Sequence, residues 1–207
     1  MSIKVSVCIP VWNQEELVVR TLDHIPRRKD LEVLVRDDGS SDRTLAVLRE
    51  YRDAHPDLNM KVYANAENMG MYYTSNRLLE AAVGEYFNMM NSDDYVLTDV
   101  YNDLVDQLDG SMDVLCMDLQ INDGHVWPVN EETNRIHCAQ VMRFIRREFA
   151  DGLKWNEHMK AASDWYFNEE LVKRNPRTVF SRRVCYMYNF PRVGSLVDLR
   201  ARGIIGE

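Results

Sequence analysis

Two adjacent aspartates follow a short apolar segment near the middle of the chain. Residues 86–90 are Tyr-Phe-Asn-Met-Met, which predicts a buried strand, and Asn91-Ser92-Asp93-Asp94 comes directly after it. Adjacent carboxylates in such a place repel each other and are costly to desolvate, so a compensating partner is expected. Backbone N–H groups could compensate them, or a Mg²⁺ or Mn²⁺ ion that also binds a substrate diphosphate. The alternative is a turn whose carboxylate caps the next helix.

Polar residues also follow two earlier apolar segments. Residues 3–11 are β-branched and mostly apolar, and Trp12-Asn13-Gln14 follows them. Residues 31–35 are again apolar and precede the polar run 36–42, Arg-Asp-Asp-Gly-Ser-Ser-Asp. Ligands bind beyond the carboxyl ends of the strands in parallel sheets. The three polar segments are therefore predicted to meet at one edge of a sheet, and this convergence predicts a site more strongly than any one motif.

Strands and helices alternate through the first half at intervals of roughly 25–30 residues, which is typical of βαβ units and a parallel sheet. The second half is less regular, with a hairpin turn predicted at 122–125. Strands are predicted at 3–11, 31–35, 58–63, 86–90, 112–121, 126–128 and 178–188, and helices at 15–25, 43–51, 74–83, 99–108, 139–149 and 163–172.

The predicted fold class is α/β, with a mostly parallel twisted sheet flanked by helices. We expect a single domain over residues 1–207, without internal repeats or linkers. Residues 1–98 are expected to form a Rossmann-like nucleotide-binding half, and residues 99–207 a less regular acceptor-binding half.

The composition is that of an ordinary globular domain. The 207 residues are 45% hydrophobic and 28% charged, and the net charge of −8 argues against general nucleic-acid binding. No apolar run has the length of a membrane span, and none resembles a signal peptide. Four widely spaced cysteines favour a reducing, cytoplasmic location. Residues 173–207 hold eight basic and two acidic residues, which form either a solvated face or a patch that faces phosphates.

In this order the motifs resemble those of family 2 glycosyltransferases, which have the GT-A fold. The resemblance covers residues 3–196 and is specific for the family, but not for the donor or the acceptor. The matching residues are Pro10, Asn13 and Glu15 in a Pro-x-x-Asn-x-Glu turn, Asp37 to Asp42, Asn68 and Gly70 with Asn76, Gly84-Glu85-Tyr86 with Asn91 to Asp94, Ser163-Asp164-Trp165, and Tyr188 with Gly194-Ser195-Leu196.

The chain departs from the family pattern at several positions. Asn91 stands where the first aspartate of the DxD motif is usual, which leaves Asp93 as the main candidate metal ligand and weakens the expectation of full metal dependence. An amide there can still hydrogen-bond a ribose or a metal-bound water. The other departures are Thr74-Ser75 for Ala-Arg, Ser163 for Glu, Asn189 for Arg and Arg192 for His.

The resemblance implies an inverting transfer of a sugar from a nucleotide diphosphate, UDP being the commonest in the family, to a hydroxyl. It implies Mn²⁺ or Mg²⁺ held by Asp93 and Asp94, and Asp164 as the general base. Asp38 is the candidate for the nucleobase edge, and Trp165 and Arg192 are candidate acceptor residues. The nucleotide-sugar site is expected to comprise Pro10, Val11, Asn13, Glu15, Asp37, Asp38, Asn68, Gly70, Asn76, Asn91, Ser92 and Asp93.

Some of these residues have structural alternatives. Asp42 is expected to be the N-cap of the helix that follows it, and Asp164 could cap its own helix. Trp165 could belong to the core, and Arg192 could be a surface charge.

The expected acceptor is a saccharide or a glycolipid. The basic tail leaves open a nucleic-acid acceptor, such as a hydroxylated base of viral DNA, although the overall acidity counts against it. A sugar nucleotidyltransferase would need a glycine-rich loop after the first strand, and residues 11–15 contain no glycine. A non-catalytic nucleotide-binding relative is the remaining alternative, suggested by Asn91 and opposed by Asp93 and Asp164. The donor sugar and the oligomeric state are left open.

Overall fold

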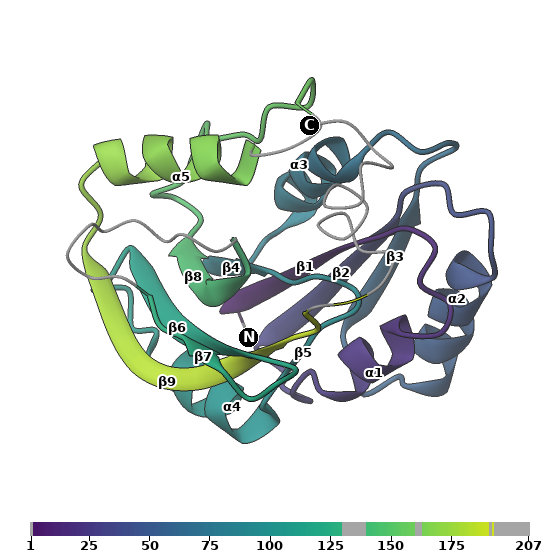
Figure 1. Cartoon of the computed structure of the whole chain (residues 1–207), viewed down its shortest axis with the longest axis horizontal. Helices are drawn as coiled ribbons and strands as arrows, with labels where there is room; N and C mark the ends of the chain where they lie inside the picture. Colours follow the sequence, from purple (N-terminus) through teal and green to yellow (C-terminus); the bar gives the residue numbers. More distant parts are fainter. Residues whose placement is uncertain (1, 130–139, 160–162, 191, 193–207) are drawn as a thin grey trace.

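The structure is a computed structural model that describes residues 2–129, 140–159, 163–190 and 192 (Figure 1). Its strands are β1 (Val5–Val11), β2 (Leu31–Asp37), β3 (Met60–Ala64), β4 (Tyr86–Met89), β5 (Tyr95–Val96), β6 (Val114–Ile121), β7 (Val126–Trp127), β8 (Arg143–Arg146) and β9 (Thr178–Tyr188). Its helices are α1 (Val18–Asp23), α2 (Thr44–Ala54), α3 (Met71–Ala81), α4 (Thr98–Gln107), α5 (Ser163–Lys173) and the 3₁₀ helix η1 (Gln140–Met142).

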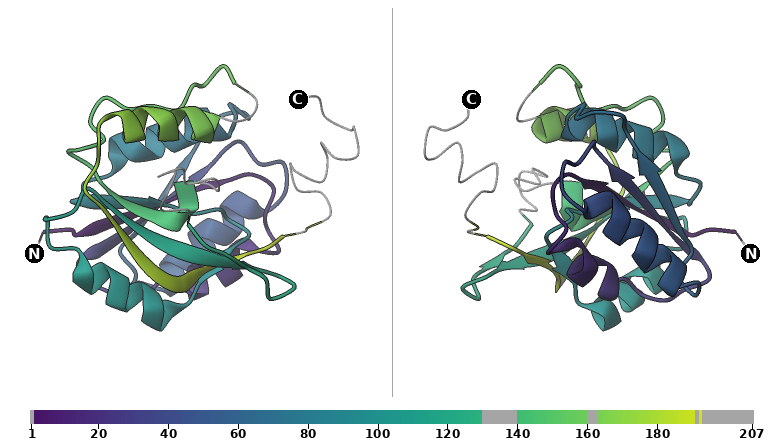
Figure 2. Two further views of the ribbon diagram at one scale, coloured as in Figure 1. Left: turned by 60° about the vertical axis from the view of Figure 1, so that its left-hand side comes forward. Right: turned by 90° about the vertical axis from the view of Figure 1, so that its right-hand side faces the viewer.

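Strands β3, β2, β1 and β4 form the parallel part of the sheet. β1 lies between β2 and β4, with Val5 opposite Leu31 on one side and Tyr86 on the other. β3 pairs with the outer side of β2. β1, β2 and β4 are buried almost throughout because helices cover both faces. Figures 1 and 2 show α3 and α5 over one face and α1, α2 and α4 over the other.

The second half continues the same sheet with strands of mixed direction. β8 is antiparallel to both β4 and β6, while β9 is parallel to β6 and antiparallel to β5. The strand order is β3-β2-β1-β4-β8-β6-β9-β5, with β7 paired to β6 as the predicted hairpin. The long strand β9 curls around this end of the sheet (Figure 2). One sheet therefore runs through both predicted halves.

The helix predicted over 139–149 is wrong. Its described part forms η1 and then β8, in which Phe144 and Ile145 are buried. The apolar spacing of this segment fits a helix. However, β8 hydrogen-bonds to β4 on one side and to β6 on the other, and this strand pairing outweighs the local helical preference. The other predicted helices and strands are confirmed, with ends shifted by a few residues, and β5 was not predicted.

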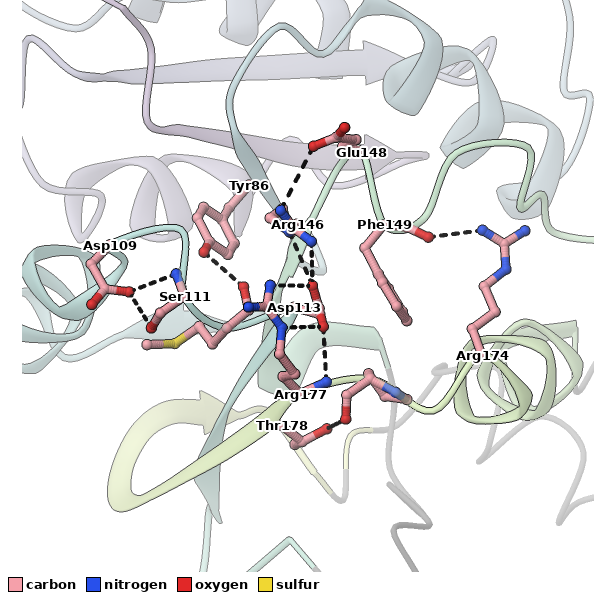
Figure 3. A network of polar contacts seen from close by, with 12 residues as sticks. Tyr86, Asp109, Ser111, Asp113, Arg146, Glu148, Phe149, Arg174, Arg177 and Thr178 are labelled. Carbon is pink, nitrogen blue, oxygen red and sulfur yellow. Dashed lines mark hydrogen bonds and ion pairs between the residues drawn. The ribbon is translucent and has the colours of Figure 1, made fainter.

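A polar network joins the residue that precedes β6, the end of β8 and the residue that precedes β9 (Figure 3). Asp113 is buried, and its carboxylate lies 2.5 Å from Arg146 Nη2 and 3.0 Å from Arg177 Nε. Hydrogen bonds from Arg177 and Arg146 outweigh the effect of burial and hold the pKa of Asp113 well below its usual range. The network fixes the ends of three strands relative to one another.

The α/β fold class predicted from the sequence is confirmed. Among the residues that the structure describes, no helix has both the length and the apolar character that crossing a membrane requires.

Candidate active site

The loops after β1 and β2 are joined by hydrogen bonds at the carboxyl edge of the sheet. Asn13, whose φ is 50°, donates its N–H to Ser40 Oγ (2.8 Å) and accepts from Ser41 N through Oδ1 (2.9 Å). Glu15 Oε2 accepts from Arg43 N at the start of α2 (2.7 Å). The first two predicted polar segments are therefore in direct contact, and Asn13 and Glu15 connect them.

Asp42 was expected to be the N-cap of α2, but it lies one residue before the N-cap and still accepts a hydrogen bond from the first turn. The N-cap of α2 is Arg43, and Asp42 Oδ1 accepts from Thr44 N (2.9 Å). Burial would raise the pKa of Asp42, but the hydrogen bonds from Thr44 outweigh it and lower that pKa. Asp42 is thus occupied by the protein itself.

Asp37 keeps one carboxylate oxygen to which none of the described residues donates a hydrogen bond. It ends β2 opposite Val11 of β1, where Val11 is buried and the preceding Pro10 is half-buried. Its Oδ2 accepts from Ser40 N (3.1 Å). Its Oδ1 is buried and has no hydrogen-bond partner among the described residues. A buried acceptor without a donor is unfavourable, so this oxygen suits a donor group brought by a ligand.

Asp38 uses both carboxylate oxygens to hold the loop that precedes α3. Oδ1 accepts from Asn65 Nδ2 (2.7 Å) and Met69 N (2.9 Å), and Oδ2 accepts from Gly70 N (2.9 Å). Asn68 Oδ1 also accepts from Gly70 N (3.0 Å). These contacts favour a role for Asp38 in shaping the loop over the predicted contact with a nucleobase.

Asp94 is fully buried and hydrogen-bonded through both oxygens. Oδ2 accepts from Tyr186 Oη (2.7 Å) and Asn91 Nδ2 (2.8 Å), and Oδ1 accepts from Asn189 N (2.7 Å). Burial and the adjacent carboxylate of Asp93 raise the pKa of Asp94 to about 6, although the three hydrogen bonds oppose the shift. The geometry favours a structural role for Asp94 and leaves Asp93 as the better candidate metal ligand.

Asp93 lies between two arginines. Arg192 Nε is 2.8 Å from Asp93 Oδ2, and Arg20 Nη2 donates to the Asp93 carbonyl (2.6 Å). Thr21 Oγ1 on α1 donates to the Ser92 carbonyl (2.9 Å) and so holds the turn. The Asp93 side chain keeps 16% of its surface exposed. Arg192, predicted for the acceptor, thus lies beside the candidate diphosphate turn.

The protein groups around Asp93 fit a cation that is bound together with phosphates. Within the described ranges, no three His, Cys, Asp or Glu side chains gather as a complete metal site. Asp93 offers a carboxylate, and Asn91, which donates through Nδ2, has its amide oxygen for a ligand. Mg²⁺ and similar ions are often held by one or two protein oxygens plus substrate phosphates.

Hydrogen bonds connect α3 to the segment that carries the candidate base. Asn76 is 1% exposed, donates to the Trp155 carbonyl (2.9 Å) and accepts from Trp155 N (2.9 Å), so it is a structural link. Ser163, the first residue of α5, donates its N–H to Tyr72 Oη on α3 (3.2 Å). Because the N-cap of α3 is bonded to Asp38, the start of α5 lies close to the Asp38 loop.

Asp164 is the second residue of α5 and is half-buried. The neighbouring Trp165 and Tyr166 are 46% and 51% exposed, and their ring centroids are 5.1 Å apart in an edge contact. Trp165 is therefore not a core residue. A carboxylate in the first turn of a helix is stabilised by the helix dipole, and exposed aromatic faces beside it suit an apolar ring face of an acceptor.

Several residues that shape this site carry no signal in the sequence. Tyr186 belongs to an ordinary strand pattern, and its contact with Asp94 follows only from the pairing of β9 with β5. Asn65 and Thr21 are similarly unmarked, because the site residues that they contact, Asp38 and Ser92, lie more than twenty residues away in the chain.

A hollow of about 580 Å³ lies at the opposite edge of the sheet, where β1 and β4 begin. Ile3, Glu85 and Arg147 are among its lining residues. None of the residues predicted for the nucleotide-sugar site lines it, so it is distinct from the candidate active site.

The model of Glycosyl transferase family 2 matches residues 6–175. The chain belongs to glycosyl transferase family 2. The matched range includes the loops after β1, β2 and β4 and the start of α5, so the resemblance noted in the sequence is confirmed.

Three similar proteins are longer than this chain, which spans only part of each of them. Chondroitin synthase from Escherichia coli is 26% identical over 197 residues, which cover 88% of this chain and 28% of that protein. The crystal structure of S. aureus TarS 1–349 in complex with UDP-GlcNAc has a TM-score of 0.81 at 24% identity, covering 93% of this chain and 60% of the other. Mannosyltransferase PcManGT from Pyrobaculum calidifontis, in complex with GDP-Man and Mn²⁺, has a TM-score of 0.74 at 20% identity, with coverages of 100% and 66%. The GT-A fold expected from the resemblance is confirmed.

Proposed function

We propose that this chain is an inverting glycosyltransferase that uses a nucleotide-diphosphate sugar, with UDP as the first choice of nucleotide. The observation that carries the proposal is the hydrogen-bonded connection at the carboxyl edge of the sheet. It runs from Asp38 to the N-cap of α3, and from Tyr72 on α3 to Ser163 at the start of α5. Family membership supports the same conclusion, as does the UDP-GlcNAc in the complex of TarS.

For the nucleobase we propose Asp37 in place of Asp38. Asp37 Oδ1 lacks a donor among the described residues, whereas both oxygens of Asp38 are engaged. Asp37→Asn is expected to weaken UDP binding about tenfold. An amide has a single acceptor oxygen, so it cannot accept from Ser40 N and from the nucleobase through separate oxygens, as the carboxylate does. Asp38→Asn is expected to lower the melting temperature first. Titration calorimetry with UDP and thermal unfolding of both variants separate the two roles.

For the diphosphate we propose Asp93, with Asn91 beside it. A divalent cation bound there would neutralise the charge that develops on the leaving diphosphate. Arg192 and Arg20 already lie at the Asp93 side chain and carbonyl. Their guanidinium groups add positive charge where the diphosphate is expected.

For the transfer step we propose Asp164 as general base. The acceptor oxygen forms a bond to the anomeric carbon while the bond from that carbon to the phosphate oxygen breaks. The leaving diphosphate takes the bonding electrons, and the hydroxyl proton passes to the Asp164 carboxylate. A single displacement of this kind inverts the anomeric configuration and needs no enzyme nucleophile.

A saccharide or glycolipid is the proposed acceptor, and Trp165 is the proposed surface for its ring. A hydroxylated nucleic-acid base would be a second acceptor class on the same chemistry. The proposed location is the cytoplasm, in keeping with the buried free thiols of Cys8, Cys116 and Cys185.

Hydrolysis of UDP-GlcNAc, with water in the place of the acceptor, tests the base. The hydrolysis rates of wild type, Asp164→Asn and Asp99→Asn should be measured once in the presence of Mn²⁺ and once in the presence of EDTA. Asp99 is an exposed aspartate in the first turn of α4, which makes it a matched control for the first turn of α5. We expect a loss of about a hundredfold for Asp164→Asn and none for Asp99→Asn. Equal slow turnover in all three proteins would favour a non-catalytic nucleotide-binding relative.

A further inference from the structure

Arg143 places a guanidinium group inside the protein, behind the helix that carries Asp164. It is the first residue of β8 and is 1% exposed. Its Nη1 donates to Asn168 Oδ1 on α5, and its buried Nε has no hydrogen-bond partner among the described residues. No ion pair of Arg143 is seen within the described ranges. A charge that is buried in this way is costly unless something compensates it.

Asp164 lies on the same helix as Asn168, the hydrogen-bond partner of this charge. Burial lowers the pKa of Arg143 to about 10, while the electrostatic influence of Cys116 and then of Asp164 acts against the decrease. Arg143 therefore remains charged at neutral pH. Asn168 lies one helical turn after Asp164, so both side chains are on the face of α5 that is turned to Arg143.

The main chain of Arg143 is also tied to the strand that leads to the diphosphate turn. Asn88 Nδ2 donates to the Arg143 carbonyl (2.9 Å), and Asn88 lies on β4 three residues before Asn91. Tyr101 Oη donates to Asn88 Oδ1 (3.2 Å) and fixes the amide. Arg143 thus has contacts with β4 through its backbone and with α5 through its side chain.

We propose that Arg143 is a positioning residue for Asp164: its buried charge and its hydrogen bond to Asn168 hold the first turns of α5 so that Asp164 points at the donor bound beyond β4. This inference rests on the proposed function of Asp164 as base. The competing role is purely structural, in which Arg143 only fills the space between β8 and α5.

Asn168→Asp separates the two roles because it gives Arg143 a carboxylate partner of its own. If Arg143 is only structural, the variant should be at least as stable and as active as wild type. If the charge of Arg143 acts on Asp164, the new carboxylate neutralises that charge while it keeps the bond between Arg143 and α5. The variant should then keep its melting temperature and its KM for UDP-GlcNAc while kcat for hydrolysis falls about tenfold. Lys173→Gln, which changes the charge of the same helix by the same amount on its exposed side, should behave as wild type.

Arg143→Met and Arg143→Lys keep the test decisive if Asn168→Asp folds poorly. Both lose the fork-shaped group, but lysine keeps the charge, so Arg143→Lys should retain more kcat than Arg143→Met at equal affinity for UDP. Wild-type kcat in folded Asn168→Asp, or equal kcat in the two Arg143 variants, would overturn the inference. An Asp164→Asn variant as active as wild type would instead refute the proposed base.

Discussion

An amide at position 91 donates a hydrogen bond to the buried carboxylate of Asp94 (2.8 Å). An ionised aspartate there could not donate this bond and would set a third carboxylate beside Asp93 and Asp94. The burial of Asp94 thereby explains the departure from the family's usual residue, because the hydrogen bond from Asn91 lowers the pKa of Asp94 against the effect of burial. It also lowers the negative charge available to hold a cation.

Asn91→Asp is expected to lower the free energy of unfolding by about 2 kcal/mol in EDTA, because a donor to a buried carboxylate is lost and a like charge is added. Excess Mn²⁺ should recover part of this loss, since it neutralises the added charge. Thermal unfolding in EDTA and in Mn²⁺ measures both effects. Asn102→Asp is the control. Asn102 lies on α4 with its Oδ1 3.5 Å from Arg28 Nη1, so this substitution should hardly change the free energy of unfolding. Wild-type stability of Asn91→Asp in EDTA would contradict this explanation.

At the scale of elements, the loop after β2 and the loop before α3 depend on a close backbone contact. Gly39 has a φ of +67°, and a Cβ built on it would lie 2.4 Å from the Glu67 carbonyl carbon. The same contact brings Met69 N and Gly70 N to the Asp38 carboxylate. Glycine at 39 is therefore required both by backbone conformation and by space.

Gly39→Ala is expected to cost about 3 kcal/mol of stability, from the left-handed backbone and from the clash together. Gly152 has a similar φ of +75° with open space around its Cβ position, so Gly152→Ala should cost only about 1 kcal/mol. Denaturant unfolding of both variants measures the difference. An equal loss of stability in the two variants would contradict this account, because it would show that the backbone at Glu67 moves aside without an energetic penalty.

The sequence predicts most elements of this fold, because the buried strands and amphipathic helices of the first half repeat in a regular order. It fails at β8, because Val141, Phe144 and Ile145 have the i, i+3, i+4 spacing that a helix would also satisfy. The segment becomes a strand because it pairs with β4 on one side and β6 on the other. Both partners come from distant parts of the chain, so local sequence does not reveal the pairing. For the same reason, the sequence does not distinguish the role of Asp38 from that of Asp37. The difference depends on the hydrogen bonds that Asn65 and Gly70 donate to Asp38.

At the scale of the whole molecule, the polar network around Asp113 lies where β6 and β9 begin and β8 ends (Figure 3). Arg177 donates to Asp113 from its backbone N–H (2.9 Å) and from Nε (3.0 Å), and Arg146 approaches from β8. No residue predicted for the active site takes part. The network should therefore affect stability without affecting the chemistry directly.

Stability is expected to decrease in acid because of Asp113. Its pKa is lowered on folding, so its contribution is present above the unfolded value of about 4 and is lost as the pH falls toward the lower folded value. Asp113→Asn should remove about 2 kcal/mol at neutral pH and flatten the loss of stability below about pH 4. Asp106→Asn, which breaks an exposed ion pair with Arg28, should cost less than about 1 kcal/mol. Melting temperatures across the acid range measure this, and an unchanged acid slope in Asp113→Asn would contradict it.

The most direct measurement of the central claim is a crystal structure of the chain with UDP and Mn²⁺. We predict that the diphosphate and the cation lie at Asp93, that the uracil edge meets Asp37, and that Asp164 faces the open end of the diphosphate. A nucleotide bound elsewhere, such as in the hollow lined by Glu85 and Arg147, would contradict the claim that the carboxyl edge of β1, β2 and β4 is the donor site.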